Sequence, residues 1–341
     1  MRVLLIGPYP PPHGGISVHV SGIRRQLTAA GIACRVLDTG VVRPGAAFGL
    51  TVLRQSFEGW TLHLHTNGHN LKSWLLALGC GLAGQFRGGS ILTLHSGMAP
   101  GYLESAPLWR RRLADFTCSL YRQVICVSPE IRSALLSLGV ESQRLEVLPA
   151  FLSTENPEVS LDPGLLAWVG RHWPLFSTVL FFRPEYGFDL LVAALARLRR
   201  IYPSLGCLVM GSGEQRAEAE NRVREEGLEE NILLAGDVDH DACLAWMSLC
   251  DVFLRPTLED GDSISVREAL SLGVPVVASR VGTRPAGVFL FQAGDLEDML
   301  AKVELAMAAK RGSQSQAAGS MDRLMEIYRQ VDGSEGSLCL D

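Results

Sequence analysis

RPTLEDGDSISVREALSLGVPVVASRVGT (Arg255–Thr283) is the most specific segment of this 341-residue chain. It follows an apolar run, passes through a polar loop that contains Gly261, continues in a helical pattern as far as Gly273, and ends in the apolar run Val274–Ala278. A helix that is closed by glycine and followed by an apolar run is typical of a β-α-β unit with parallel strands. The segment therefore predicts a parallel sheet covered by helices.

The polar loop of this segment joins a predicted helix N-terminus to two carboxylates. Backbone N–H groups and the helix dipole make such a helix start a good anion site, and Ser263 and Ile264 lie there. Asp260 and Glu268 lie eight residues apart across the loop and the helix. Carboxylates cannot bind phosphate, but they accept hydrogen bonds from sugar or ribose hydroxyls. The segment thus favours a ligand with both phosphate and hydroxyl groups.

The second half of the chain repeats the alternation of strands and helices seen in this segment. We predict strands at Val179–Phe182, Cys207–Met210, Ile232–Leu234, Val252–Leu254 and Val274–Ala278, and helices near Leu190–Tyr202, Glu214–Glu226, Ala242–Leu249 and Ile264–Leu272.

The first half of the chain has its own series of alternating strands and helices. We predict strands at Val3–Ile6, Ala33–Leu37, Thr61–His65, Ile91–His95, Val124–Val127 and Leu145–Leu148. Proline-containing residues 150–174 look like a linker. We therefore predict an α/β fold of two Rossmann-like, doubly wound parallel-sheet domains that face a central cleft, at residues 1–155 and 156–315.

Composition and charge limit the class of protein. The eight cysteines are scattered and include no CxxC pair, so we expect buried thiols in a reducing compartment. The four-residue apolar start and the ten-residue run Trp74–Ala83 are too short for a signal peptide core or a spanning helix, so we expect a cytoplasmic protein. Residues 1–150 carry a balance of +7 and the rest −12, which indicates an anionic partner for the first half or simple drift of composition.

The ordered set acid-Gly-x6-Glu-Ala, followed by Gly-x-Pro-Val-Val, resembles the donor-binding signature of retaining glycosyltransferases with the GT-B fold, particularly glycosyltransferase family 4. The family has glutamate where this chain has Asp260. The resemblance implies that Asp260 contacts hydroxyls of the donor sugar, that Glu268 contacts the ribose, and that the backbone at Gly261, Ser263 and Ile264 contacts the diphosphate. A helix with ordinary N-terminal acids would explain the carboxylates but not the whole set.

Two features of the first half are similar to the same family. GPYPPPHGGIS (Gly7–Ser17) resembles its first loop, in which Gly14 and Gly15 would let the backbone approach the donor phosphate and the acceptor. His95, in ILTLHSGM, looks like the family histidine that hydrogen-bonds the transferred sugar. A structural turn and a capped surface histidine are the alternatives.

The segment LFFRPEYGFDLL (Leu180–Leu191) departs from the family pattern. The family usually has an arginine, and then a lysine immediately before glycine, to neutralise the diphosphate. This chain has Phe181 and Tyr186 at those positions, and Arg183 is the only cation nearby in the sequence. We assign the phosphate role to Arg183, and this departure leaves a non-catalytic homologue as an alternative.

VMGSGEQ (Val209–Gln215) resembles the nucleotide loop of the family's second domain. Gly211 and Gly213 would lie at the nucleotide, and the base is expected against the backbone around Val238. A lone glycine motif also fits a dinucleotide site, but neither half has the full glycine spacing followed by an acid.

The sequence predicts no metal site and no cofactor apart from the donor substrate. His63 and His65 alternate onto one strand face, yet no third ligand is near them in the sequence, so a core or cleft-wall role is expected. A D-x-D motif in a metal-binding role is also lacking.

The segment Ala106–Gln123 reads as a basic amphipathic helix. Trp109, Leu113, Phe116 and Leu120 share one face, and arginines surround it. The helix could lie on an anionic membrane surface, whereas our preferred interpretation is a helix that faces the core.

The complete pattern predicts a retaining, metal-independent glycosyltransferase for polysaccharide or glycoconjugate synthesis. It would move a hexose-type residue from a nucleoside diphosphate sugar to a saccharide or lipid-linked saccharide, with peripheral membrane contact as one interpretation and no nucleic-acid partner. An impaired sugar-nucleotide-binding homologue and a nucleotide-sugar epimerase are the alternatives. The fold also implies that a helix at about 316–332 crosses back to the first domain.

Overall fold

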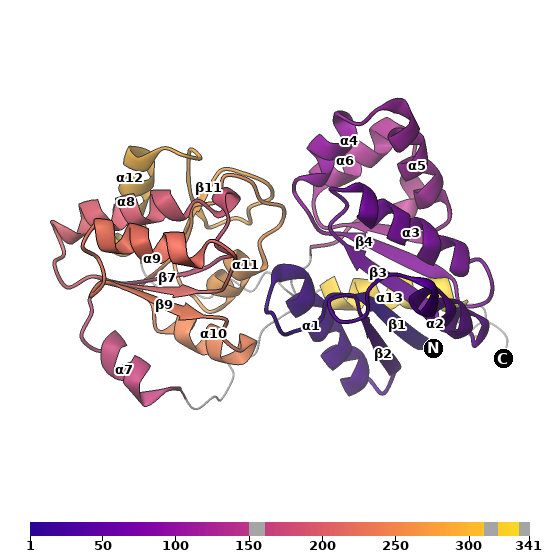
Figure 1. The fold of residues 1–341 in the computed structure, drawn as a ribbon, viewed down its shortest axis with the longest axis horizontal. Helices are drawn as coiled ribbons and strands as arrows, with labels where there is room; N and C mark the ends of the chain where they lie inside the picture. Colours follow the sequence, from indigo (N-terminus) through magenta and orange to yellow (C-terminus); the bar gives the residue numbers. More distant parts are fainter. Residues whose placement is uncertain (150–160, 310–319, 334–341) are drawn as a thin grey trace. The chain divides into compact units, whose positions relative to one another are not determined.

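The six apolar runs of the first half form one six-stranded parallel sheet in the computed structural model (Figure 1). The structure describes residues 1–149, 161–309 and 320–333, of which 1–149 and 320–333 form a first unit and 161–309 a second. The predicted domain boundaries, at residues 155 and 315, lie outside the described residues.

The first sheet has the strand order β2-β1-β3-β4-β5-β6, and α-helices connect most successive strands. The elements are β1 (Arg2–Gly7), α1 (Gly15–Ala29), β2 (Ala33–Asp38), α2 (Ala46–Phe57), β3 (Thr61–Thr66), α3 (Leu71–Ala83), β4 (Ser90–Leu94), α4 (Ala99–Glu104), α5 (Leu108–Ser119), β5 (Gln123–Cys126), α6 (Pro129–Leu138), the 3-10 turn η1 (Ser142–Arg144) and β6 (Leu145–Val147).

Helix α13 (Ser320–Asp332) packs on this first sheet although it lies far away in the sequence (Figure 1). Its residues Leu324, Ile327, Tyr328 and Val331 share a core with β1 and α1. Arg122 Nη1 donates a hydrogen bond of 2.9 Å to the carbonyl of Val331. The helix therefore completes the core of the first unit.

The second unit is a separate six-stranded parallel sheet with the order β12-β11-β10-β7-β8-β9. Its elements are α7 (Pro163–Val169), β7 (Leu175–Val179), η2 (Pro184–Tyr186), α8 (Phe188–Arg199), β8 (Gly206–Met210), α9 (Arg216–Glu225), β9 (Ile232–Gly236), α10 (His240–Ser248), β10 (Val252–Arg255), α11 (Ile264–Ser271), β11 (Val276–Ser279), β12 (Phe289–Phe291) and α12 (Leu296–Ala308). Two doubly wound, Rossmann-like sheets are thus confirmed.

Two predictions for the second unit are wrong in detail. The strand expected at Val179–Phe182 lies earlier, at Leu175–Val179, because the strand includes the buried polar residues Ser177 and Thr178 and the apolar residues Leu180 and Phe182 pack beyond its end. The expected linker at 150–174 contains α7, whose N-cap Asp162 accepts a hydrogen bond of 2.8 Å from the Leu165 amide.

None of the helices in the described residues combines the length and the apolar character needed to cross a membrane.

Candidate functional site

Each sheet has one place where its strand order reverses. In the first sheet this switch point lies between β1 and β3, and in the second it lies between β7 and β10. In open α/β sheets, ligands bind beyond the carboxyl ends of the strands at such points. The loops that follow these strands contain most of the predicted site residues.

The loop before α11 is held against the loop that follows β11. The Thr283 amide donates a hydrogen bond of 2.8 Å to the Gly261 carbonyl, and Asp262 and Thr283 form an isolated parallel bridge. Gly282 has a φ of +62°, and a Cβ there would lie 2.2 Å from the Gly261 carbonyl oxygen. Only glycine therefore allows these two loops to approach each other so closely.

Asp260 binds two arginine side chains at this contact. Arg255 Nε donates to Oδ2 of Asp260 at 3.0 Å, and Arg284 Nη2 donates to the same oxygen at 3.0 Å. The side chains of Asp260, Arg255 and Arg284 are 12%, 10% and 3% exposed. A nearly buried cluster of two cations and one anion thus lies at the second switch point.

The opposite charges of this cluster shift the pKa values of its members against the effect of burial for Asp260 and Arg255, but not for Arg284. Burial would raise the pKa of Asp260, but Arg255 and Arg284 outweigh it and hold the pKa below its usual value. Burial would lower the pKa of Arg255, but Asp260 outweighs it and raises that pKa. For Arg284 burial dominates, and its pKa is lowered. Nη1 of Arg284 is buried without a hydrogen-bond partner among the described residues.

The cluster adds a structural function to Asp260. Its oxygens already accept hydrogen bonds from both arginines, from Thr257 Oγ1 and from the Gly261 amide. The expected contact with the donor sugar stays a prediction. The sequence pattern does not identify Arg255 and Arg284 as site residues, although Arg255 is the first residue of the segment Arg255–Thr283.

The loop that follows β7 contains Arg183 and Tyr186, and Arg255 from β10 packs against it. Arg183 is exposed, and its guanidinium lies 5.8 Å from the centre of the Phe181 ring. The guanidinium of Arg255 lies 5.1 Å from the centre of the Tyr186 ring, so the fold brings a second cation, distant in the sequence, to this loop. The fold thus places Arg255, from β10, beside Tyr186, which occupies the position where the family usually has a lysine.

Glu268 lies on the first turns of α11 and is 5% exposed. His240 Nε2 lies 2.7 Å from its Oε1, and His240 is the first residue of α10. This hydrogen bond fixes the orientation of the carboxylate. The ribose contact of Glu268 stays a prediction, as do the diphosphate contacts of Ser263 and Ile264 at the start of the helix.

The glycines of the predicted nucleotide loop have a packing function. A Cβ on Gly211 would lie 1.8 Å from the Leu180 carbonyl oxygen, and a Cβ on Gly213 would lie 2.6 Å from the Phe182 amide nitrogen. The Gly211 amide donates a hydrogen bond of 2.7 Å to the carbonyl of Gly236, the last residue of β9. The β8 loop is thereby tied to the strand end that precedes Val238, and nucleotide binding by these residues stays a prediction.

The predicted glycine loop of the first unit leads directly into α1. Gly14 is the N-cap of the helix, and its amide donates a hydrogen bond of 2.8 Å to Ser17 Oγ. Gly15 is exposed, and a Cβ there would have nothing within 4 Å. Gly15 therefore leaves open space beside the helix N-terminus.

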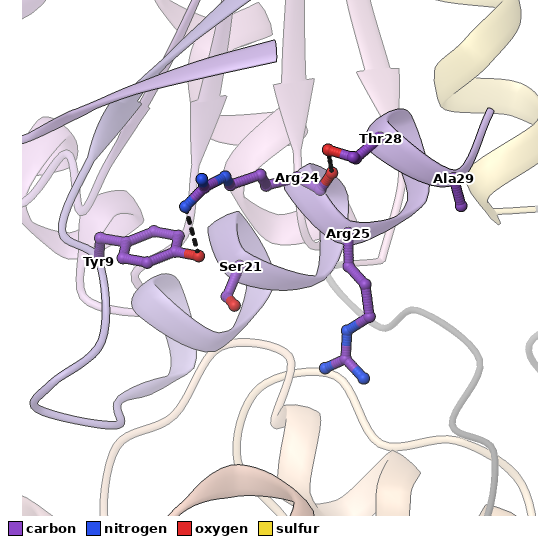
Figure 2. A pocket seen from close by; sticks show the side chains of 6 residues that line it. All are labelled: Tyr9, Ser21, Arg24, Arg25, Thr28 and Ala29. Carbon is purple, nitrogen blue, oxygen red and sulfur yellow. Dashed lines mark hydrogen bonds between the residues drawn. The ribbon is translucent and has the colours of Figure 1, made fainter. Parts of the chain in front are cut away.

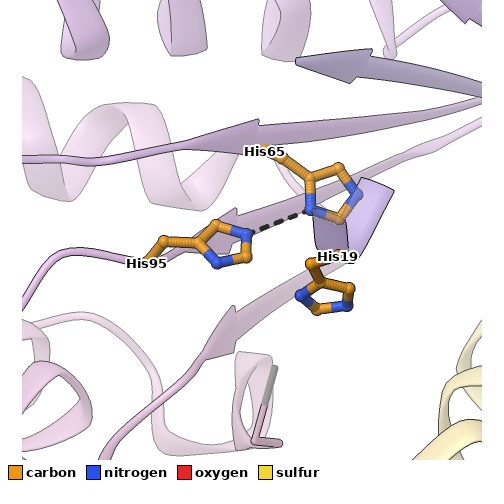
Figure 3. Close-up of side chains that lie close together, drawn as sticks. All are labelled: His19, His65 and His95. Carbon is orange, nitrogen blue, oxygen red and sulfur yellow. Dashed lines mark hydrogen bonds between the residues drawn. The ribbon is translucent and has the colours of Figure 1, made fainter. Parts of the chain in front are cut away.

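Three histidines meet at the first switch point (Figure 3). His65 is the next-to-last residue of β3, His95 directly follows β4, and His19 reaches them from α1. His65 Nδ1 and His95 Nε2 lie 3.1 Å apart. His19 is 46 residues away from His65 in the sequence, so only the fold brings this third histidine close.

His63 has a structural function. Its Nδ1 lies 2.5 Å from Tyr328 Oη, and its Nε2 lies 2.7 Å from Thr93 Oγ1. The ring is fully buried and links β3 to β4 and to α13. The core role that was expected for His63 is confirmed.

A pocket of about 530 Å³ opens beside α1 (Figure 2). Arg24 Nη1 donates a hydrogen bond of 3.0 Å to Tyr9 Oη within it, and the predicted site residues do not line it.

The preferred interpretation of the basic helix is wrong. On α5, Trp109 and Phe116 are each 54% exposed, because the small residues Ala114, Thr117 and Cys118 form its buried face instead. The aromatic face therefore points to solvent in this unit.

Both halves of the chain match family models of known proteins. Residues 47–156 match the family model "Glycosyltransferase Family 4", and residues 174–308 match "Glycosyl transferases group 1". A phosphatidyl-myo-inositol mannosyltransferase of Propionibacterium freudenreichii is 31% identical over 82% of this chain and 77% of its own. The gpi3 subunit of the phosphatidylinositol N-acetylglucosaminyltransferase of Schizosaccharomyces pombe is 27% identical over 54% of this chain, which spans only 40% of that relative.

The fold agrees as well. The solved structure of Anabaena HepE in complex with UDP-glucose aligns over 99% of this chain and 100% of its own, with a TM-score of 0.71 and 16% identity. Sequence and fold lead to the same assignment: the chain belongs to the group 1, family 4 glycosyltransferases, which have the GT-B fold.

Proposed function

We propose that this glycosyltransferase transfers a hexose-type residue, with retention of anomeric configuration, from a nucleoside diphosphate sugar to a saccharide or lipid-linked saccharide, in polysaccharide or glycoconjugate synthesis. The observation that carries this proposal is the excess positive charge at the second switch point. Arg255 and Arg284 together exceed the charge of Asp260, and Arg284 Nη1 has no partner within the described residues. A diphosphate would supply the missing acceptor.

The donor is proposed to lie along the loops of the second unit. The amides at Gly261, Ser263 and Ile264 would hold the diphosphate at the N-terminus of α11, and Glu268 would accept hydrogen bonds from the ribose. Arg183 stays a proposed diphosphate contact at the exposed end of the β7 loop.

The other donor contacts are likewise proposals. The base would lie against the backbone at Gly211, Gly213 and Val238, and Asp260 and His95 would contact the transferred sugar.

The proposed reaction needs no dedicated base and no divalent ion at the diphosphate. In retaining enzymes of this family the leaving phosphate is thought to assist the transfer of the acceptor proton on the same face of the sugar. Arg255 and Arg284 would stabilise the charge that develops on the leaving diphosphate, which is the function that a metal ion otherwise has. Tyr186 in place of the family lysine suggested a homologue with impaired catalysis. If Arg255 and Arg284 supply the missing positive charge, that argument becomes weaker.

Turnover of a donor panel tests the proposed function. Relatives of this chain include a GDP-mannose-dependent mannosyltransferase of Mycolicibacterium smegmatis, and the HepE structure contains UDP-glucose, so the panel includes UDP- and GDP-linked hexoses. We expect one of them to be turned over in the presence of EDTA, with release of the nucleoside diphosphate and retained configuration in the product. Donor binding without turnover over a broad acceptor panel would instead indicate a binding protein, and a changed sugar without an acceptor would indicate an epimerase.

An apolar, basic face of the first unit supports peripheral contact with the cytoplasmic face of a membrane. The helices α2, α3 and α5 are neighbours there, and each exposes large apolar side chains. Those with at least 49% exposure are Leu50, Phe57, Leu75, Leu82, Phe86, Leu108, Trp109 and Phe116. Lys72 on α3, Arg112 on α5 and Arg87 in the segment after α3 are exposed as well. Apolar side chains surrounded by cations suit an anionic bilayer, where lipid-linked acceptors would be found.

Replacing Trp109 and Phe116 with glutamate is expected to weaken binding to vesicles of phosphatidylcholine and phosphatidylglycerol by about tenfold or more, because both apolar contacts and charge complementarity are lost. Co-sedimentation with the vesicles measures this binding. Ile201→Glu is the matched control, since Ile201 is 61% exposed in the second unit. Equal weakening by the control, or no vesicle binding by the parent protein, would contradict membrane contact.

Gly15→Val is expected to block ligand approach without unfolding the protein. A side chain at this position meets no protein atom within 4 Å, so the free energy of unfolding should change by no more than about 0.5 kcal/mol. Donor turnover should fall at least about tenfold, because the new methyl groups occupy the space beside the N-terminus of α1. Gly101→Val in α4 makes the same change in open space and should leave turnover intact. If Gly15→Val remains fully active, the loop is only a turn.

A further inference from the structure

The three histidines at the first switch point form a compact triangle (Figure 3). One ring nitrogen of each residue lies within 4.8 Å of one ring nitrogen of the other two. The ring centres are 5.4 Å apart for His19–His65, 5.1 Å for His19–His95 and 5.4 Å for His65–His95. Three imidazoles from three different elements thus surround one point.

The three rings are neutral, and two of their nitrogens have no hydrogen-bond partner among the described residues. Burial lowers the pKa of His19 to about 3, and burial together with repulsion between neighbouring imidazoles lowers the pKa values of His65 and His95 well below the usual value. His19 and His65 are 7% and 1% exposed. His19 Nδ1 and His65 Nε2 are buried without a hydrogen-bond partner among the described residues. Neutral imidazoles with unused lone pairs are the form that binds metal ions.

We propose that His19, His65 and His95 bind a late first-row divalent metal ion, with Zn²⁺ the best suited. Zn–N bonds of about 2.0–2.1 Å at tetrahedral angles put ligand nitrogens about 3.3 Å apart. His65 Nδ1 and His95 Nε2 lie 3.1 Å apart in a hydrogen bond, whose proton must move to the other nitrogen of its ring before both nitrogens bind the ion. The remaining separations must close by no more than about 1.5 Å. Small rotations of the rings therefore complete the site.

The surroundings favour three protein ligands and one open position. His63 contacts His65, with ring centres 4.0 Å apart, but both of its nitrogens already pair with hydroxyl groups, so it supports His65 rather than binding the ion. His95 is only partly buried, whereas His19 and His65 are buried, so we expect solvent to reach the ion on the side of His95. Imidazole nitrogens without a carboxylate select Zn²⁺, Co²⁺ or Ni²⁺ over Mg²⁺ and Ca²⁺.

The site goes beyond the proposed function, which requires no divalent ion. It also makes a specific prediction about that function, because His95 is the proposed contact of the transferred sugar. An ion bound to His95 would compete with that contact, so Zn²⁺ should inhibit transfer rather than support it.

Metal binding is tested on the full chain without a polyhistidine tag and without donor. Co²⁺ should bind with a stoichiometry of one per chain and give the visible d–d absorption of a tetrahedral site, and Zn²⁺ should displace it. His19→Gln and His65→Gln should each weaken Zn²⁺ binding at least about tenfold in competition with a chromogenic chelator. His172→Gln is the matched control, because both nitrogens of His172 pair with carbonyl groups of the second unit.

A second measurement does not depend on the folding of these variants. X-ray absorption of the Zn²⁺-loaded parent protein should show three imidazole ligands at about 2.0 Å. Absence of the Co²⁺ bands, fewer than three imidazole ligands, or unchanged binding in a folded His19→Gln protein would overturn the proposal. Transfer in EDTA is measured separately, so failure of the metal site and failure of the proposed function give different results.

Discussion

Replacing Asp260 with asparagine is expected to lower the free energy of unfolding by about 3 kcal/mol at pH 7, the largest stability change that we predict for this chain. Asp260 is the anion to which Arg255 and Arg284 donate at 3.0 Å, and both arginine side chains are at least 90% buried. Asparagine keeps the volume but not the charge, so two guanidinium groups remain close together with no counter-ion. Unfolding in denaturant, followed by circular dichroism, measures the loss.

An exposed ion pair in the same unit provides the control. Arg216 and Glu220 are joined at 2.9 Å with side chains 40% and 47% exposed, and Glu220→Gln should cost less than about 1 kcal/mol because water solvates both groups. Adding Arg284→Met to Asp260→Asn should restore part of the lost stability, since it removes one of the unpaired cations. A loss for Asp260→Asn no larger than that of the control would contradict a buried cluster.

The effect of Asp260 has a defined pH dependence. Its folded pKa lies below the unfolded value of about 4, so its contribution is complete above that pH and is lost as the pH falls through the folded pKa. The difference in stability between the parent protein and Asp260→Asn should therefore be constant from pH 7 to about pH 5 and should shrink below about pH 4. Unfolding curves measured over this pH range test the sign.

Much of the fold could be predicted because apolar runs and helical periods coincide with the observed elements. The stretch from Arg255 to Thr283 contains β10's last residue, α11 and β11 in the expected order. The misplaced strand at Val179–Phe182 shows the limit of this approach. An apolar run is a signal of burial, and Leu180 and Phe182 are 3% and 2% exposed although they lie outside the strand.

The site was harder to predict because its residues contact partners that lie far away in the sequence. Asp260 and Glu268 belong to a local pattern, but Arg284 reaches Asp260 from the loop after β11 and His19 reaches His95 from α1. Local spacing contains no signal for such pairs. Arg255 offered one clue, because an arginine that directly continues a buried apolar strand must find an acceptor near the end of that strand.

Replacing Glu268 with glutamine is expected to lower kcat/KM for the donor by about 100-fold while the protein stays folded. Glu268 is 5% exposed, and its Oε1 lies 2.7 Å from His240 Nε2, so the carboxylate is oriented before the ligand arrives. Glutamine has almost the same shape, but its NH₂ group cannot accept a hydrogen bond from a ribose hydroxyl. Because the ribose is remote from the reacting bond, most of the loss should lie in KM.

The proposed ribose contact of Glu268 can be distinguished experimentally from a general loss of activity. A donor that lacks both ribose hydroxyls removes the partner of Glu268, so it should bind the parent protein and Glu268→Gln with equal affinity in calorimetry, whereas the natural donor should bind them differently. Glu259→Gln is the control, since Glu259 is an exposed acid of the same loop. If the variant loses equal affinity for both donors, Glu268 acts on the shape of the loop through His240. If it loses affinity for neither, the carboxylate does not bind the donor, and the ribose must be held elsewhere on the second unit.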